Sequence, residues 1–234
     1  MSKNHETQLS NLIEGVEKAY RNAEDLFQEA SILYAHGALC RALFLHQISL
    51  EECGKIEMLG AWATSLLSGF EVDIRKVTAA LASHRAKNRA NAYFLPVSDA
   101  ERQARANADI PAAVAVFKGQ QTDFHTESNL AKNSSLYVDF KDEEFIAPSE
   151  RITEVMVRET ASRNAEFLAL TGPKVEMMLR WKSNPAEAEH IVKLFRNRLE
   201  QLRSDMPDDP EKAMSVLMED LLSEVKTPVA AQKQ

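Results

Sequence analysis

Three charged residues on one predicted helix could transfer protons or stabilise a negative charge. Apolar residues recur at three- and four-residue steps along the stretch 38–59, and Glu52 falls in line with them. A carboxylate among core residues costs free energy unless it is paired, and Lys55 lies one helical turn away, within reach of both Glu51 and Glu52. The pattern predicts a buried or half-buried Glu–Lys cluster, which is either a structural ion pair or part of a functional site.

A second group of such residues lies on the next predicted helix, where His84 and Lys87 are one turn apart. A local positive patch on a chain with a net charge of −7 suits an anionic substrate. His84 is either an ordinary core or surface residue or, if the two helices pack together, a group that moves protons near neutral pH beside the Glu–Lys cluster. The stretch 74–97 contains no acidic residue, and its basic residues are Arg75, Lys76, Arg85, Lys87 and Arg89.

Other spacings in the chain carry less weight. Arg41 and His46 lie five residues apart, which is about 140° around a helix, so they do not share a face. Glu187 and His190 form half of a di-iron bundle signature, but a second Glu-x-x-His is missing. The six histidines and two cysteines offer no zinc spacing. We therefore expect no metal site and no other cofactor.

Long helices are expected to position these residues. Amphipathic periodicity predicts helices over 6–35 and 38–67, and the short link at Gly37 favours an antiparallel hairpin. A third helix is predicted over 73–95, with its apolar stripe running on into His84. Further helices are expected near 100–108, 111–117, 149–170, 173–182, from Pro185 onward and over about 208–225, the last capped by Asp208-Asp209-Pro210.

The segment near 133–148 breaks the helical period, and we expect it to be irregular or extended, with a short strand or strap at 136–138. The predicted fold is all-α: an antiparallel helical bundle with additional C-terminal helices. We expect a helical core over 1–145, a C-terminal helical region over 146–227 packed on the same domain, and a loose tail over 228–234.

Composition excludes several classes of protein. With 44% hydrophobic and 27% charged residues the chain can bury a core, and its seven glycines and eight prolines are few for a fold with many tight turns. The N-terminal residues lack the apolar core of a signal peptide, and no run of eighteen apolar residues could span a membrane. Two cysteines on one predicted helix fit a reducing compartment. We therefore expect a cytoplasmic protein with no membrane contact.

Four short motifs spread over roughly residues 20–140 suggest a relationship to known proteins: Asn22-Ala23; Arg41-Ala-Leu-Phe followed by Leu50-Glu51-Glu52-x-Gly54-Lys55; Ser83-His84-x-x-Lys87; and Ser135-Leu136-Tyr137-Val138-Asp139. In these motifs and their order the chain resembles the AbiV family of bacterial abortive-infection proteins, which confer phage resistance. That family looks like part of the HEPN superfamily, whose members are small helical bundles, commonly homodimers, and often metal-independent ribonucleases.

The resemblance implies a toxin-like protein that arrests an infected cell by cutting RNA, with a phage-encoded protein as a candidate activator. The usual HEPN signature is Arg, four to six residues, then His, and Arg41 with His46 has that form, which makes them an alternative catalytic pair. The alternative is a non-catalytic sensor that binds a phage protein or a nucleic acid through the same groove.

The hypothesis for the site combines both lines of reasoning. His84 acts as general acid or base, Lys87 and Lys55 stabilise phosphate charge, and Glu52 with Glu51 orients them. The residues expected to contact RNA are Arg85, Asn88, Arg89 and Tyr137. A homodimer could place two such sets around one groove.

Overall fold

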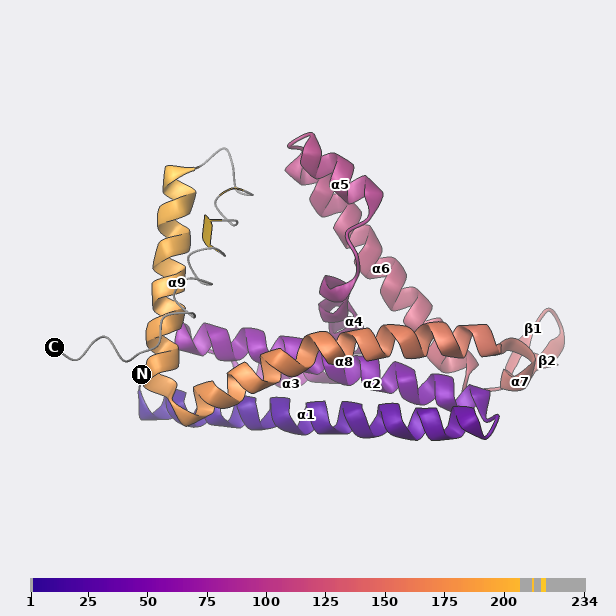
Figure 1. The fold of residues 1–234 in the computed structure, drawn as a ribbon. Coiled ribbons are helices and arrows are strands. Elements are labelled where there is room, and N and C mark those ends of the chain that lie inside the picture. The colour runs from indigo at the N-terminus through magenta and orange to yellow at the C-terminus, as the bar shows by residue number, and fades with distance from the viewer. Residues whose placement is uncertain (1, 207–211, 213–215, 218–234) are drawn as a thin grey trace.

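The computed structural model describes residues 2–206, 212, 216 and 217, which form helices and one short β-hairpin (Figure 1). Three long helices make up the body of the molecule: α1 (Lys3–Ala35), α2 (Leu39–Leu67) and α8 (Glu154–Ser183). They lie side by side, and α2 packs against both α1 and α8. The prediction of an all-α helical bundle is confirmed.

The α1–α2 hairpin forms as the sequence predicts. Ser2 caps α1 by accepting a hydrogen bond from the backbone N–H of His5, and Gly37 adopts a φ of +75°, which favours glycine, in the link to α2. The two helices end up buried to different extents. α1 buries one face, whereas α2 is buried on several sides, which is typical of the central helix of a bundle.

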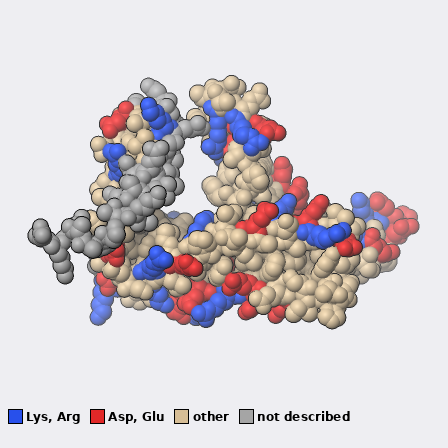
Figure 2. Space-filling view, in the orientation of Figure 1, with Lys and Arg blue, Asp and Glu red and all other residues tan. Residues whose placement is uncertain are grey.

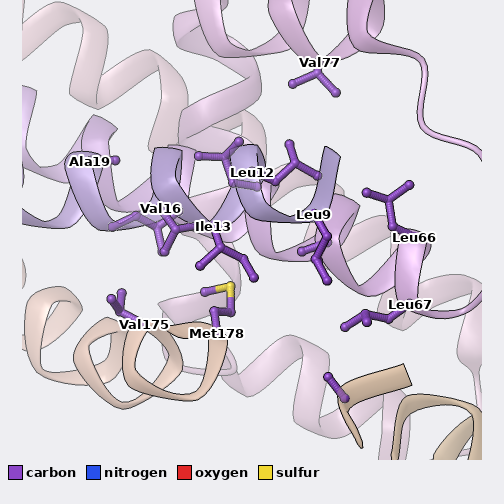
Figure 3. Packing of buried hydrophobic residues seen from close by; sticks show 14 residues of the cluster. Leu9, Leu12, Ile13, Val16, Ala19, Leu66, Leu67, Val77, Val175 and Met178 are labelled. Atoms are coloured by element: carbon purple, nitrogen blue, oxygen red, sulfur yellow. The ribbon is translucent and has the colours of Figure 1, made fainter. Parts of the chain in front are cut away.

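The largest apolar cluster joins α1, α2 and α8 near one end of the bundle (Figure 3). Ile13 and Val16 of α1 are fully buried, and Val175 and Met178 of α8 pack in the same cluster. Each fully buried aliphatic side chain of this kind contributes roughly 1.5–3 kcal/mol. This packing explains why α8 continues past Leu170, where we predicted its end: burial beyond that point outweighs the break signal of Gly172 and Pro173.

The third predicted helix is two helices, so the prediction of a single helix over 73–95 is wrong. α3 (Ile74–Ala82) ends at Ser83, whose backbone is extended, and α4 (His84–Asn91) begins directly after it. The Ser83 hydroxyl accepts a hydrogen bond from the backbone N–H of Ala86, which caps α4. The apolar stripe of α3 therefore does not continue into His84, which lies on a separate helix.

An arm made of α5 (Asp99–Ala106) and α6 (Ile110–Ser134) projects from the bundle (Figure 1). The predicted helix over 111–117 is thus much longer than expected. Its C-terminal half returns to the bundle and packs on α2 and α4, which buries the polar residues Ser128 and Lys132. Tertiary contacts rather than an apolar pattern define this half of the helix.

The segment near 133–148 contains an antiparallel hairpin of β1 (Asp139–Lys141) and β2 (Glu144–Ile146). The prediction of an irregular or extended segment is therefore confirmed, but the strand that was expected at 136–138 begins later, at Asp139. A short helix, α7 (Pro148–Arg151), leads into α8, and α9 (Pro185–Asp205) follows α8.

The predicted tail over 228–234 lies outside the described residues, and so do Asp208, Asp209 and Pro210, which were predicted to cap the last helix. Within the described part, no helix combines the length and apolar character needed to cross a membrane.

Gly54 lets α4 approach α2 closely. A Cβ atom on Gly54 would lie 2.4 Å from the backbone oxygen of Lys87. One turn further along α4, the side-chain amide of Asn91 donates a hydrogen bond to the backbone oxygen of Leu50 at 2.6 Å. Backbone contact thus fixes where α4 lies, and with it the side chains that α4 carries.

We expect Gly54→Ala to destabilise the protein by about 1–3 kcal/mol or more, because the new methyl group must push α4 away from α2. Gly119→Ala is the matched control: Gly119 lies in α6 with open space around it, so alanine there should stabilise by about 0.5–1 kcal/mol. Urea unfolding of the two variants measures the difference. A stabilised Gly54→Ala variant would contradict the close packing.

Candidate functional site

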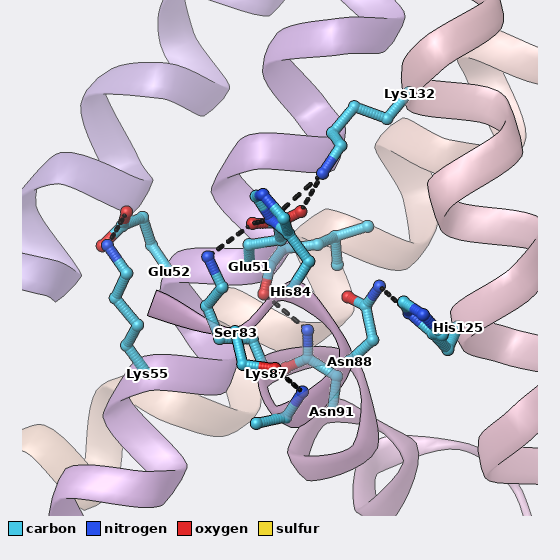
Figure 4. Close-up of polar contacts among 12 residues, drawn as sticks. Glu51, Glu52, Lys55, Ser83, His84, Lys87, Asn88, Asn91, His125 and Lys132 are labelled. Atoms are coloured by element: carbon cyan, nitrogen blue, oxygen red, sulfur yellow. Dashed lines mark hydrogen bonds and ion pairs between the residues drawn. The ribbon is translucent and has the colours of Figure 1, made fainter. Parts of the chain in front are cut away.

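Glu51 of α2 is the centre of a buried charge cluster (Figure 4). Its Oε2 atom lies 2.6 Å from Nδ1 of His84 and 2.7 Å from Nζ of Lys87, both on α4. Its Oε1 atom lies 2.7 Å from Nζ of Lys132 on α6. One carboxylate therefore binds cationic side chains from two other helices.

The cluster carries an excess of positive charge. Burial raises the pKa of the Glu51 carboxyl, but hydrogen bonds from Lys132, Lys87 and His84 outweigh burial and lower the pKa below its ordinary value. The carboxylate is therefore ionised at neutral pH. Lys87 and Lys132 are 7% and 10% exposed, so two buried ammonium groups share one carboxylate. A site of this kind favours an anion as a further partner.

His84 stands at the surface of the cluster, with 54% of its side chain exposed. Its Nδ1 atom is close to both Glu51 and Nζ of Lys132, the latter at 3.1 Å. An ammonium group can only donate a hydrogen bond, and a carboxylate can only accept one. The short contact between His84 and Glu51 is therefore a hydrogen bond in which Nδ1 carries the proton and donates to the carboxylate. Nε2 is then the nitrogen that can exchange a proton with a bound molecule.

The structure adds two residues that the sequence analysis missed, Lys132 and His125, both on α6. Nδ1 of His125 lies 3.2 Å from the side-chain amide nitrogen of Asn88. Burial lowers the pKa of His125, and the nearby charges of Arg85 and Lys132 lower it further. The available signal was the spacing of Gln121, His125, Ser128 and Lys132, which places them on one helical face once α6 is known to be long.

Glu52 and Lys55 form the ion pair that we predicted, with Nζ of Lys55 2.6 Å from Oε1 of Glu52. The pair lies apart from the Glu51 cluster (Figure 4). It lines a separate groove of about 640 Å³ between α1, α2 and α3, together with Asn22 and the apolar side chains of Leu12, Leu59, Val77 and Leu81. The structure therefore brings His84 and Lys87 to Glu51, and leaves Glu52 with Lys55.

Arg41 and His46 contact different parts of the molecule. Arg41 donates a hydrogen bond to the backbone oxygen of Ser135. His46 is 1% exposed, its ring packs edge-on against Phe27, and its Nδ1 accepts a hydrogen bond from the Asn164 amide at 3.2 Å. Burial lowers the pKa of His46 to about 4. In this structure His46 is a neutral, buried side chain.

The residues expected to contact RNA differ in their exposure. Arg85 and Arg89 are exposed on α4, Asn88 is buried beside His125, and Tyr137 is 60% exposed just beyond α6. In the part of the chain that the structure describes, no group of three or more His, Cys, Asp or Glu side chains is arranged to hold a metal ion.

Comparison with known proteins places the chain in a family. The HEPN_AbiV family model, described as AbiV, matches residues 11–169, which include Glu51, His84, His125 and Lys132. The chain belongs to the AbiV family. It is therefore an AbiV-family, HEPN-type protein, as the motif order predicts.

One curated relative shares a substantial stretch of sequence with this AbiV-family chain. The "Uncharacterized protein y4gJ" of Sinorhizobium fredii (strain NBRC 101917 / NGR234) is 44% identical over 112 residues, which cover 48% of this chain and 58% of the relative. The matched stretch thus spans less than two thirds of that relative. No solved structure matches the chain.

We expect Glu51→Gln to cost about 3–5 kcal/mol of stability at pH 7, because it leaves two buried ammonium groups without a carboxylate. Glu52→Gln is the matched control one residue away: its partner Lys55 reaches solvent, so the loss should be clearly smaller. Urea unfolding measures both. Equal losses would mean that Glu51 is not the centre of the cluster.

His46 should make stability depend on pH. Its folded pKa of about 4 lies below the unfolded value of 6.5, so the unfolded state binds the extra proton and stability falls as pH drops from 6.5 towards 4. Between pH 7 and pH 5 the wild type should lose about 2 kcal/mol more than His46→Gln, which cannot titrate. Parallel pH curves for the two proteins would contradict a buried neutral His46.

Proposed function

We propose that this AbiV-family protein is a phage-defence toxin that acts as a metal-independent HEPN-type endoribonuclease and arrests the infected cell from within its cytoplasm. The observation that supports the proposal most is the cluster at Glu51, in which two buried lysines and an exposed histidine share one carboxylate. Excess positive charge beside a proton-transfer group is the arrangement that cleavage of a phosphodiester needs.

In the proposed mechanism the nucleophile belongs to the RNA. Nε2 of His84 takes the proton of a 2′-hydroxyl while that oxygen bonds to the adjacent phosphorus. The bond from phosphorus to the 5′-oxygen breaks, and the 5′-oxygen takes a proton from water. The products are a 2′,3′-cyclic phosphate and a 5′-hydroxyl, and the reaction requires no cofactor.

The lysines and the carboxylate support this step. Lys87 and Lys132 stabilise the charge that grows on the phosphate oxygens, and Glu51 orients His84 through Nδ1. Of the two glutamates predicted to orient His84 and the lysines, Glu51 has that role in the proposal, and Lys132 has the role predicted for Lys55. Glu52 and Lys55 line the groove beside α1.

RNA binding in this proposal is local. The chain has a net charge of −7, and Figure 2 shows charges of both signs mixed over the visible face, with acidic side chains gathered around β1 and β2. Arg85 and Arg89 are exposed on α4 and would hold the backbone through phosphate contacts, which carry no sequence information. The exposed ring of Tyr137 can stack on a base. A homodimer would bring two such sites together, and a phage protein would trigger them.

The test is cleavage of RNA by the purified protein, with and without EDTA and with and without extract of infected cells to supply an activator. We expect wild type to leave 2′,3′-cyclic phosphate ends whether or not EDTA is present. His84→Ala should slow cleavage by roughly 10²–10⁴-fold, while His190→Ala, an exposed histidine on α9, should cut like wild type.

Two outcomes decide against the proposal. If wild type and His84→Ala leave the same RNA pattern in every condition, the protein is not this nuclease, and the sensor alternative gains. If EDTA abolishes cleavage, the metal-independent mechanism is wrong.

A further inference from the structure

Two contacts bridge α4 and α6 beside the Glu51 cluster. Their α4 residues are one helical turn apart, and their α6 residues are seven positions apart, about two turns. In the first, Nδ1 of His84 lies 3.1 Å from Nζ of Lys132, and both groups bind the Glu51 carboxylate. The second joins Asn88 to His125, with 3.2 Å between the amide nitrogen and Nδ1. His84 and Asn88 are four residues apart on α4, which is about 6 Å along the helix axis. The surface where α4 meets α6, the α4–α6 seam, therefore carries two polar positions in a row.

Asn88 fixes the chemical state of His125. The Asn88 amide is buried and its N–H group points at Nδ1, so Nδ1 accepts and the single ring proton of a neutral His125 lies on Nε2. Protonating Nδ1 would set two donors against each other. The charged groups that act on His125 are Arg85 of α4, Lys132 of α6 and Glu51 of α2, together with His84. Burial and the two cations lower the pKa of His125, which favours its neutral form. His125 is partly exposed, so its Nε2–H group can donate to a bound molecule.

The second position also has a positive charge beside it. Arg85 lies on α4 between His84 and Asn88, is exposed, and is near enough to His125 for its charge to act on the ring. An N–H donor on α6 and an exposed guanidinium group on the neighbouring α4 are both suited to a phosphate oxygen. The one-turn separation along α4 is of the same order as the separation of neighbouring phosphates along an extended single strand.

We propose that His125 and Arg85 form a second phosphate subsite, which binds the phosphate next to the one held at His84. The inference rests on the proposed function, because it assumes that an RNA strand lies along the α4–α6 seam. His125 acts here as a neutral hydrogen-bond donor. It binds substrate and takes no part in the proton transfer that we assign to His84.

The experiment compares a dinucleotide that has one phosphodiester with the same dinucleotide carrying one more phosphate, at its 5′ or at its 3′ end. The 2′-deoxy versions cannot react, so their affinity tests the subsite even if the protein cuts nothing. For wild type we expect the additional phosphate at one of the two ends to tighten binding roughly tenfold. The same gain should appear in kcat/KM for the cleavable versions.

Variants at the second position should remove that gain, and His125→Ala should leave binding of the plain dinucleotide unchanged. His125→Ala and Arg85→Gln should each lose most of the gain in affinity from the additional phosphate. His125→Gln still offers an N–H donor and should keep a large part of that gain. A purely structural role for His125 would weaken both ligands equally. His190→Ala, far away on α9, should behave as wild type.

The outcomes separate the two proposals. If neither end phosphate improves binding to wild type, or if His125→Ala keeps the full gain, the subsite is wrong. If the deoxy ligands show the gain but no RNA is cut in any condition, the subsite stands and the nuclease proposal fails. Loss of one limb of the pH–rate profile in His125→Ala would overturn the neutral-donor role, because a donor that does not titrate leaves the shape of the profile intact.

Discussion

A carboxylate can be buried in a protein only when donors surround it, and Glu51 imposes this requirement on two neighbouring helices at once. α4 and α6 meet it by bringing His84, Lys87 and Lys132 to the carboxylate from two directions. The approach is possible because Gly54 has no side chain where the backbone of α4 rests. The positions of α4 and α6 in the bundle therefore follow from one charge that has to be neutralised and one missing methyl group that makes room.

A single turn of α2 faces two different surroundings. Glu51 and Gly54 serve the contact with α4, whereas Glu52 and Lys55 face the groove beside α1 and α3. Neighbouring residues on a helix differ by about 100° in direction, so adjacent glutamates of the same chemical type enter different environments. The Leu-Glu-Glu-x-Gly-Lys motif that points to the AbiV family therefore combines two structural features in one stretch of helix: the contact with α4 and the ion pair in the groove.

Much of the bundle is predictable from the sequence because its determinants are local. The α1–α2 hairpin follows from apolar periodicity and Gly37, and the Glu52–Lys55 pair follows from three-residue spacing. The break at Ser83 was missed because a capping serine between two helices leaves the helical period nearly intact.

The partners at the site could not be predicted in the same way. Lys132 and His125 lie 81 and 74 residues after Glu51 in the chain, and only the packing of α6 brings them there. The choice between Glu51 and Glu52 likewise depends on where α4 lies, which periodicity does not determine. α4 itself has only eight residues, and an isolated helix of that length is scarcely stable in water. The order of α4 therefore depends on its packing against the bundle. Local melting of α4 would remove His84, Arg85, Lys87 and Asn88 together, so the site is assembled or dismantled as one unit.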